Sequence, residues 1–157
     1  MKRIIYTLIS LIILTTLSSS VNAQSNDGLK ELYSIKGVTS IYVSKSMLSL
    51  VKNKSFGHDA ISSVVQYLDA IEIFNSDNEE SVGKVKTIID KFITSSGMEI
   101  LTKIKQDDEN VLILGKSNGT QFTHLLMLIE EDTDELTLIN MTGKIPLEKI
   151  RELSSGL

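Results

Sequence analysis

Two histidines are the side chains of this chain whose ordinary pKa lies closest to neutrality, and each has a neighbour relevant to proton transfer. His58 precedes Asp59 in a polar segment, which is typical of half of a general-base pair. No Gly-x-Ser-x-Gly turn supplies a nucleophile for it. His124 follows Thr123 in an apolar segment, on the face that we expect for Phe122 and Leu126, and it lacks metal-ligand spacing. We therefore interpret His124 as structural and predict no catalytic residue.

The tripeptide Gly115-Lys116-Ser117 resembles the end of a phosphate-binding loop. The complete motif has a glycine five residues before Gly115, where this chain has Asn110. A phosphate loop also leads into a helix, whose first amide groups face the phosphates. Here Asn118-Gly119 follows, which is a hairpin signal. The tripeptide thus predicts no nucleotide site, and no cofactor is expected.

Acidic residues gather at positions 77–80, 107–109 and 130–135. Calcium binds six to eight oxygens, but these segments lack the alternation of carboxylates around a glycine that calcium loops use. The first cluster suits a helix N-terminus and the other two suit hairpin tips, so no metal site is predicted. Two carboxylates that are distant in the sequence can come together in the folded protein, where the sequence does not reveal the pair. A loop-based hydrolase with carboxylate chemistry therefore stays an alternative.

The first 23 residues have the pattern of a secretory signal peptide. Lys2 and Arg3 form the basic start, residues 4–17 carry no charge, and small residues precede the junction of Ala23 and Gln24. The apolar run is shorter than the roughly 20 residues of a membrane-spanning helix. We expect cleavage between Ala23 and Gln24 and a periplasmic or secreted location.

Composition narrows the function classes further. The chain has no cysteine, which excludes disulfides, thiolate metal sites, cysteine nucleophiles and a lipid anchor on cysteine. Loss of Lys2 and Arg3 with the leader leaves 14 basic against 20 acidic residues, so no nucleic-acid partner is expected. No second long apolar run follows, so no membrane span is expected after cleavage. We predict a lead-in with a short helix over 24–36 and one domain over 37–157.

The first half of the domain alternates helical and strand patterns. Strands are predicted over 38–43 and 70–74, and helices over 29–35 and 60–68. Ser44 is expected to begin a helix that buries Met47, Leu48 and Val51. The clearest helix has Ser76 and Glu79 as a capping box and ends at Gly97. Its apolar stripe comprises Val82, Val85, Ile88, Ile89, Phe92 and Ile93.

From Met98 onward the apolar period changes to two, which predicts strands over 98–105, 111–116, 122–130 and 136–141. Pro146 is expected to begin a last helix with Leu147, Ile150 and Leu153 inward. The fold class is α+β: a two-layer sandwich with a mostly antiparallel sheet of about six strands, covered by helices on one face. The last four strands form a meander with segment 125–129 central. The first two strands, joined through helices, suggest a parallel pair.

A family resemblance covers nearly all of the chain after the leader, roughly residues 29–153. The segment Gly37-Val38-Thr39-Ser40-Ile41-Tyr42-Val43-Ser44-Lys45-Ser46-Met47-Leu48 resembles the opening of a family of small exported domains of unknown function in Bacteroidota. The step Thr142-Gly143 followed by Pro146-Leu147-Glu148-Lys149-Ile150 is similar to that family's ending. The resemblance implies an envelope location and a single domain, and it transfers no catalytic residue.

The sequence favours a non-catalytic periplasmic module that binds an envelope protein or a small ligand. Its support is the lack of a nucleophile motif, of metal-ligand spacing and of a cofactor loop. Two alternatives stay open: the carboxylate hydrolase, and an accessory of an envelope-stress regulatory system.

Overall fold

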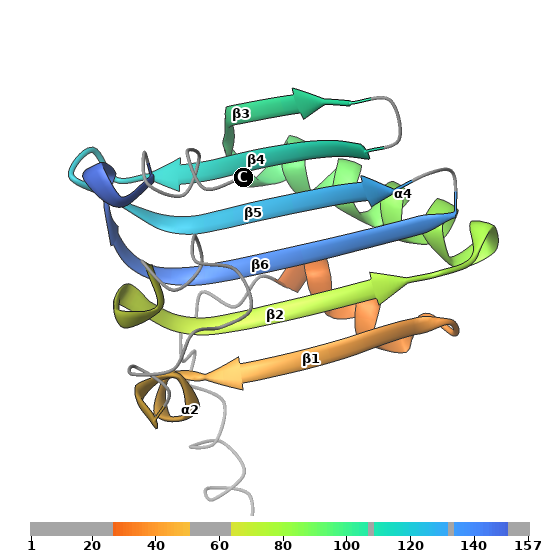
Figure 1. The fold of residues 1–157 in the computed structure, drawn as a ribbon, viewed down its shortest axis with the longest axis horizontal. Helices are drawn as coiled ribbons and strands as arrows, with labels where there is room; N and C mark the ends of the chain where they lie inside the picture. Colours follow the sequence, from red (N-terminus) through yellow and green to blue (C-terminus); the bar gives the residue numbers. More distant parts are fainter. Residues whose placement is uncertain (1–26, 51–63, 107–108, 132–133, 151–157) are drawn as a thin grey trace, which may run out of the picture.

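The computed structural model describes residues 27–50, 64–106, 109–131 and 134–150. Six strands form one antiparallel sheet in the order β1-β2-β6-β5-β4-β3 (Figure 1). The strands are β1 (Val38–Ser44), β2 (Leu68–Ser76), β3 (Glu99–Lys105), β4 (Glu109–Ser117), β5 (Gln121–Glu131) and β6 (Glu135–Pro146). The helical elements are η1 (Asp27–Ser34), α2 (Lys45–Leu50), η2 (Val65–Tyr67) and α4 (Glu79–Ser96), and residues 147–150 are also helical.

The predicted α+β class and the meander of the last four strands are confirmed. Strand β2 pairs with β6 and β1 pairs with β2, so the sheet as a whole is not a simple meander. The expectation of a parallel first pair is wrong, because β1 and β2 are antiparallel over their whole length. Helix α2 follows β1 and η2 precedes β2, and both lie at the same end of the sheet (Figure 1). A connection that leaves and re-enters at one end makes the two strands antiparallel.

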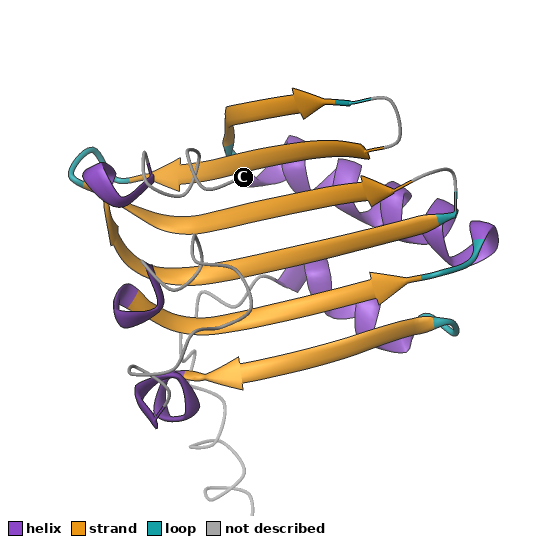
Figure 2. Ribbon diagram, viewed as in Figure 1, coloured by secondary structure: helices purple, strands orange, loops and turns teal. Residues whose placement is uncertain are grey.

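Strand β5 is apolar on both faces and lies between β4 and β6, as its composition predicts. Its alternate residues separate two buried clusters. The helix-side cluster contains Leu126 and Leu128 of β5, with the stripe of α4 and with Leu29 and Leu32 of η1. The second cluster, on the opposite face, includes the following residues: Leu125 and Met127 of β5, Leu48 of α2, and Val64 and Val65 around η2. Figure 2 shows α4 and η1 together behind the sheet.

The N-cap of helix α4 lies two residues after the predicted cap, Ser76. Asn78 is the N-cap, and its side-chain oxygen accepts a hydrogen bond from the Ser81 amide at 3.0 Å. Strand β2 extends to Ser76, so this residue belongs to the sheet, and its buried hydroxyl bonds to the Ser81 hydroxyl instead. Gly97 ends the helix in the left-handed region with φ 68°, as predicted.

Several predicted details at element ends differ from the structure. Met47 and Leu147 are exposed rather than buried, because each lies at the rim of the sheet. Pro146 is the last residue of β6. Residues 60–63 of the predicted helix over 60–68 lie outside the described residues, and its described part contains η2 before β2 begins at Leu68. The expectations at Val51, at Leu153 and at the Ala23–Gln24 junction fall outside the described residues.

Candidate functional site

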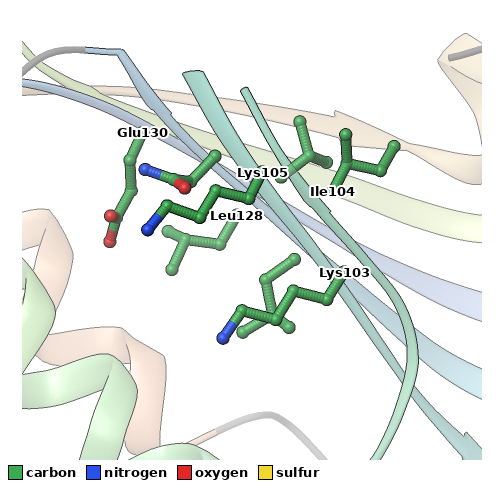
Figure 3. A pocket seen from close by; sticks show the side chains of 8 residues that line it. Lys103, Ile104, Lys105, Leu128 and Glu130 are labelled. Carbon is green, nitrogen blue, oxygen red and sulfur yellow. The ribbon is translucent and has the colours of Figure 1, made fainter. Parts of the chain in front are cut away.

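A groove of about 320 Å³ lies at the β3 edge of the sheet, on the side of α4 (Figure 3). The lining side chains form two rows across β3, β4 and β5. The first row is Lys103, Leu112 and Leu128, which are direct cross-strand neighbours. The next row is Lys105, Asn110 and Glu130 on the same three strands. Side chains directly across antiparallel strands share a face, so the two rows line one surface. Leu128 belongs to the helix-side cluster, and it gives the groove an apolar floor.

The groove carries positive charge in an acidic chain. Lys103 and Lys105 are exposed and extend on the same side of β3, with Leu128 between them (Figure 3). Among the described residues, neither ammonium group has an ion-pair partner. Glu130 at the end of the groove is paired with Lys86 of α4, with Nζ and Oε1 3.2 Å apart. Its carboxylate is thus engaged by Lys86, whereas Lys103 and Lys105 are exposed.

A second polar cluster lies on the helix side of β2 and β6. Glu72 accepts two hydrogen bonds of 2.7 Å, one from the Tyr33 hydroxyl and one from the Asn140 amide nitrogen. The Tyr33 ring meets Phe74 edge to face, with centroids 4.9 Å apart. Burial, and then the hydrogen bond to Glu72, raise the pKa of Tyr33, so the phenol stays protonated and can donate.

The Tyr33–Glu72–Asn140 cluster fastens η1 to the sheet. Asn140 is only 1% exposed, and the oxygen of its side-chain amide, Oδ1, has no hydrogen-bond partner among the described atoms. Each carboxylate oxygen of Glu72 accepts one hydrogen bond, so the side chain is held between Tyr33 of η1 and Asn140 of β6. Its role in this geometry is to orient η1 against β2 and β6.

One known protein family covers most of the chain. The profile of the family described as domain of unknown function (DUF4252) matches residues 32–153. The chain belongs to the DUF4252 family. No curated protein sequence matches it. The groove and the Tyr33–Glu72–Asn140 cluster both lie within the matched residues.

A solved structure also resembles this DUF4252 domain in part. LppA of Mycobacterium tuberculosis, described as a candidate lipoprotein, is 12% identical to it. The alignment covers 85% of this chain and 80% of that chain, with a TM-score of 0.38, which supports no conclusion about function. Within the described ranges of the DUF4252 domain, none of the helices has the length and apolar character needed to cross a membrane.

His124 of the DUF4252 domain is half-buried on β5, and its Nδ1 lies 3.1 Å from the Thr123 hydroxyl. The register of β5 with β4 shifts between Phe122 and His124, which lie across from Ser117 and Lys116, so Thr123 is an extra residue on β5 relative to β4. The prediction that His124 shares a face with Phe122 is therefore wrong: Phe122 belongs to the second cluster, whereas Leu126 belongs to the helix-side cluster. His58 and Asp59 fall outside the described residues.

The environment of His124 predicts a pH dependence of stability. Burial, and then the positive charge of Lys116, lower the pKa of His124 below its ordinary value of 6.5. The unfolded chain then takes up the proton more readily than the folded one, so the free energy of unfolding should decrease as the pH falls below about 6.5. Urea unfolding at pH 7.5 and pH 5.5 should show this decrease in the wild type and a smaller one in His124→Gln. An unchanged decrease in His124→Gln would contradict this assignment.

Gly115-Lys116-Ser117 lies in a β-hairpin rather than before a helix. Strand β4 ends at Ser117, and the chain turns at Gly119, with φ +96°, into β5. A Cβ at Gly115 would lie 2.6 Å from a ring carbon of Phe122, so this glycine makes room for the aromatic ring. The tripeptide thus has a packing role, and its amide groups belong to the strand ladder.

The described acids of the second and third segments meet in the sheet, where Glu109 lies across from Glu131 and Glu131 lies across from Glu135. Glu79 and Glu80 lie in the first turn of α4, where hydrogen bonding and charge from Lys84 lower the pKa of Glu80. Residues 107–108 and 132–133 are outside the described residues. In the described part of the chain, no three His, Asp or Glu residues gather closely enough to hold a metal ion.

The groove is the site that sequence reasoning did not identify. A signal for it exists in the alternation Lys103-Ile104-Lys105, because residues two apart in a strand point to the same face. The apolar floor could not be assigned in the same way, since Leu112 and Leu128 reach it only through strand pairing.

Proposed function

We propose that this DUF4252 protein is an exported, non-catalytic binding module of the bacterial envelope, and that its groove receives an anionic ligand with an apolar part. The leader pattern of residues 1–23 supports a periplasmic or secreted location, and the resemblance described above supports a source in Bacteroidota. The groove supports the class of ligand.

The observation that carries the proposal is the pair of ammonium groups above an apolar floor. Lys103 and Lys105 are two residues apart on one strand, so their side chains leave the strand about 7 Å from each other. This spacing lets both cations approach one carboxylate, sulfonate or phosphate group. Leu112 and Leu128 then offer apolar surface to the rest of the ligand, and the groove volume of about 320 Å³ lies in the range of small-ligand sites.

The contents of the groove favour binding over catalysis. Among the described residues that line the groove, the one carboxylate is that of Glu130, and it is paired with Lys86. His124 lies on the same strand but six residues away, about 20 Å along β5. A general acid–base reaction needs such groups within hydrogen-bond reach of one substrate. Positive charge and apolar surface are sufficient to bind an amphipathic anion.

The proposal is tested with 8-anilinonaphthalene-1-sulfonate, an aromatic sulfonate whose fluorescence rises on binding. The double variant Lys103→Gln/Lys105→Gln should weaken binding about tenfold, equivalent to about 1.4 kcal/mol, because both charge contacts with the sulfonate are lost. Added salt should weaken wild-type binding for the same reason. Fluorescence titration measures the dissociation constant, and circular dichroism verifies that each variant is folded.

The matched control is Lys91→Gln/Lys144→Gln, which removes the same charge from exposed lysines outside the groove. This control should bind the probe within about twofold of the wild type. Equal weakening in both double variants would show that only net charge matters. That result, or unchanged binding in Lys103→Gln/Lys105→Gln, would overturn the proposed site.

A further inference from the structure

Strand β1 forms one edge of the sheet, and its outer side has no strand partner in the described part of the chain. Natural edge strands are guarded by charges, proline, bulges or short length. The seven residues of β1, VTSIYVS, contain no charge and no proline. Their pairing with β2 is regular, without a bulge. The outer edge of β1 is therefore a regular row of backbone donors and acceptors, without the charge, proline or bulge that usually prevents pairing at an edge strand.

The opposite edge of the sheet is guarded. Strand β3 carries Glu99, Lys103 and Lys105, and its register with β4 shifts between Ile100 and Thr102. The same sheet thus has one edge protected by charge and irregularity and one edge that is open. This contrast makes the open edge a feature specific to β1.

Large side chains border the open edge on both faces of the sheet. Ile41 is 51% exposed and lies across from Ile73, on the face of the second cluster. Tyr42 is 60% exposed and lies across from Glu72, on the face of η1 and α4. A strand added to β1 would bury apolar surface on both faces at once.

We propose that β1 pairs in antiparallel fashion with β1 of a second copy of this chain, about a two-fold axis at Ile41. The two six-stranded sheets then become one continuous sheet. The cross-strand pairs in this register are Ile41 with Ile41, Ser40 with Tyr42, Thr39 with Val43, and Val38 with Ser44. Each pair is uncharged, and three of the four include a β-branched residue, so the edge is complementary to itself in charge and shape.

The residues beyond the strand fit the same register. Lys45 follows β1 and is paired with Asp69, with Nζ and Oδ1 2.6 Å apart. The register places Lys36 of the second copy beside this ion pair, where the Asp69 carboxylate offsets the added positive charge. A strand from a different protein would also satisfy the backbone of β1, but this chain itself supplies a match over all seven residues.

The inference is independent of the proposed ligand site. The groove lies at the β3 edge and the dimer forms at the β1 edge, so both grooves stay open in the dimer. Loss of the dimer should leave binding of the sulfonate probe unchanged. Failure of one proposal is therefore distinguishable from failure of the other.

Sedimentation equilibrium of the full chain tests the pairing with two matched variants. Ile41→Lys places a charge at the centre of β1, and Ile100→Lys places the same charge on β3, where the native isoleucine is 64% exposed. We expect a dimer for the wild type and for Ile100→Lys, and at least a tenfold weaker dimer for Ile41→Lys. A monomeric wild type at about 100 μM, or a dimer unaffected by Ile41→Lys, would overturn the proposal.

A cross-linking experiment tests the same pairing even if Ile41→Lys fails to fold. The chain lacks cysteine, so Ile41→Cys has a single thiol. Directly opposed residues on antiparallel strands lie within disulfide range, so mild oxidation should link two copies of Ile41→Cys and should leave Ile100→Cys largely unlinked. Equal linking of both variants, or none in Ile41→Cys, would contradict pairing through β1.

Discussion

Replacing Gly143 with alanine is expected to lower the free energy of unfolding by about 3 kcal/mol or more. The added Cβ would overlap the carbonyl oxygen of Tyr67 and would lie 2.8 Å from the Cα of Leu68. Both are backbone atoms, and Leu68 is paired with Gly143 where β2 meets β6. The strain cannot be relieved by rotating a side chain, so part of the β2–β6 ladder must shift.

Urea unfolding monitored by circular dichroism measures this effect. The matched control is Gly83→Ala, because no atom lies within 4 Å of a Cβ at this position of α4. Alanine is a better helix former than glycine, so Gly83→Ala should raise the free energy of unfolding by about 0.5–1 kcal/mol. If Gly143→Ala were as stable as the wild type, β2 and β6 would not approach as closely as described.

Replacing Leu126 with alanine is the second large expected effect, a loss of about 3 kcal/mol. Leu126 is fully buried in the helix-side cluster, and its neighbours on the adjacent strands are Leu114 and Asn140. The truncation leaves a cavity that the central strand cannot close by moving, because β5 is paired on both sides.

The same urea experiment includes Ile100→Ala as the comparison. Ile100 is largely exposed on the edge strand β3, so its truncation should change the free energy of unfolding by less than about 0.5 kcal/mol. Similar losses for Leu126→Ala and Ile100→Ala would contradict the assignment of β5 to the centre of the sheet.

Local sequence signals were sufficient to predict most of the helices and strands. The stripe of α4 and its glycine stop are set by contacts within one helix, and all six stripe residues do pack in or against the helix-side cluster. The apolar run 125–129 correctly indicates a central strand, because only a doubly covered strand buries both faces. Helix starts and strand ends were less predictable: the extension of β2 to Ser76 moved the cap of α4 to Asn78.

Features that depend on strand order could not be read from the sequence. The antiparallel pairing of β1 with β2 depends on where α2 and η2 pack, which the local pattern does not encode. The groove depends on the alignment of β3, β4 and β5, which brings Lys103 next to Leu112 and Leu128. Of the residues singled out for their chemistry, Glu130 lines the groove, whereas His124 lies at the other end of β5.

The structural role of Gly143 could be predicted from the sequence only in part. The Thr142-Gly143 step carried part of the family resemblance, and a glycine inside a strand signals a close approach of another backbone. The identity of that backbone, Tyr67 and Leu68, follows only from the pairing of β2 with β6.

The central claim, that the groove binds an amphipathic anion, is tested most directly by nuclear magnetic resonance. The amide spectrum of the ¹⁵N-labelled protein is recorded during a titration with 8-anilinonaphthalene-1-sulfonate. We predict saturable shifts concentrated on residues 103–105, 110–112 and 128–130, which line the groove, and their loss in Lys103→Gln/Lys105→Gln. Shifts centred on another surface, or no saturable shift in these three segments, would contradict the account.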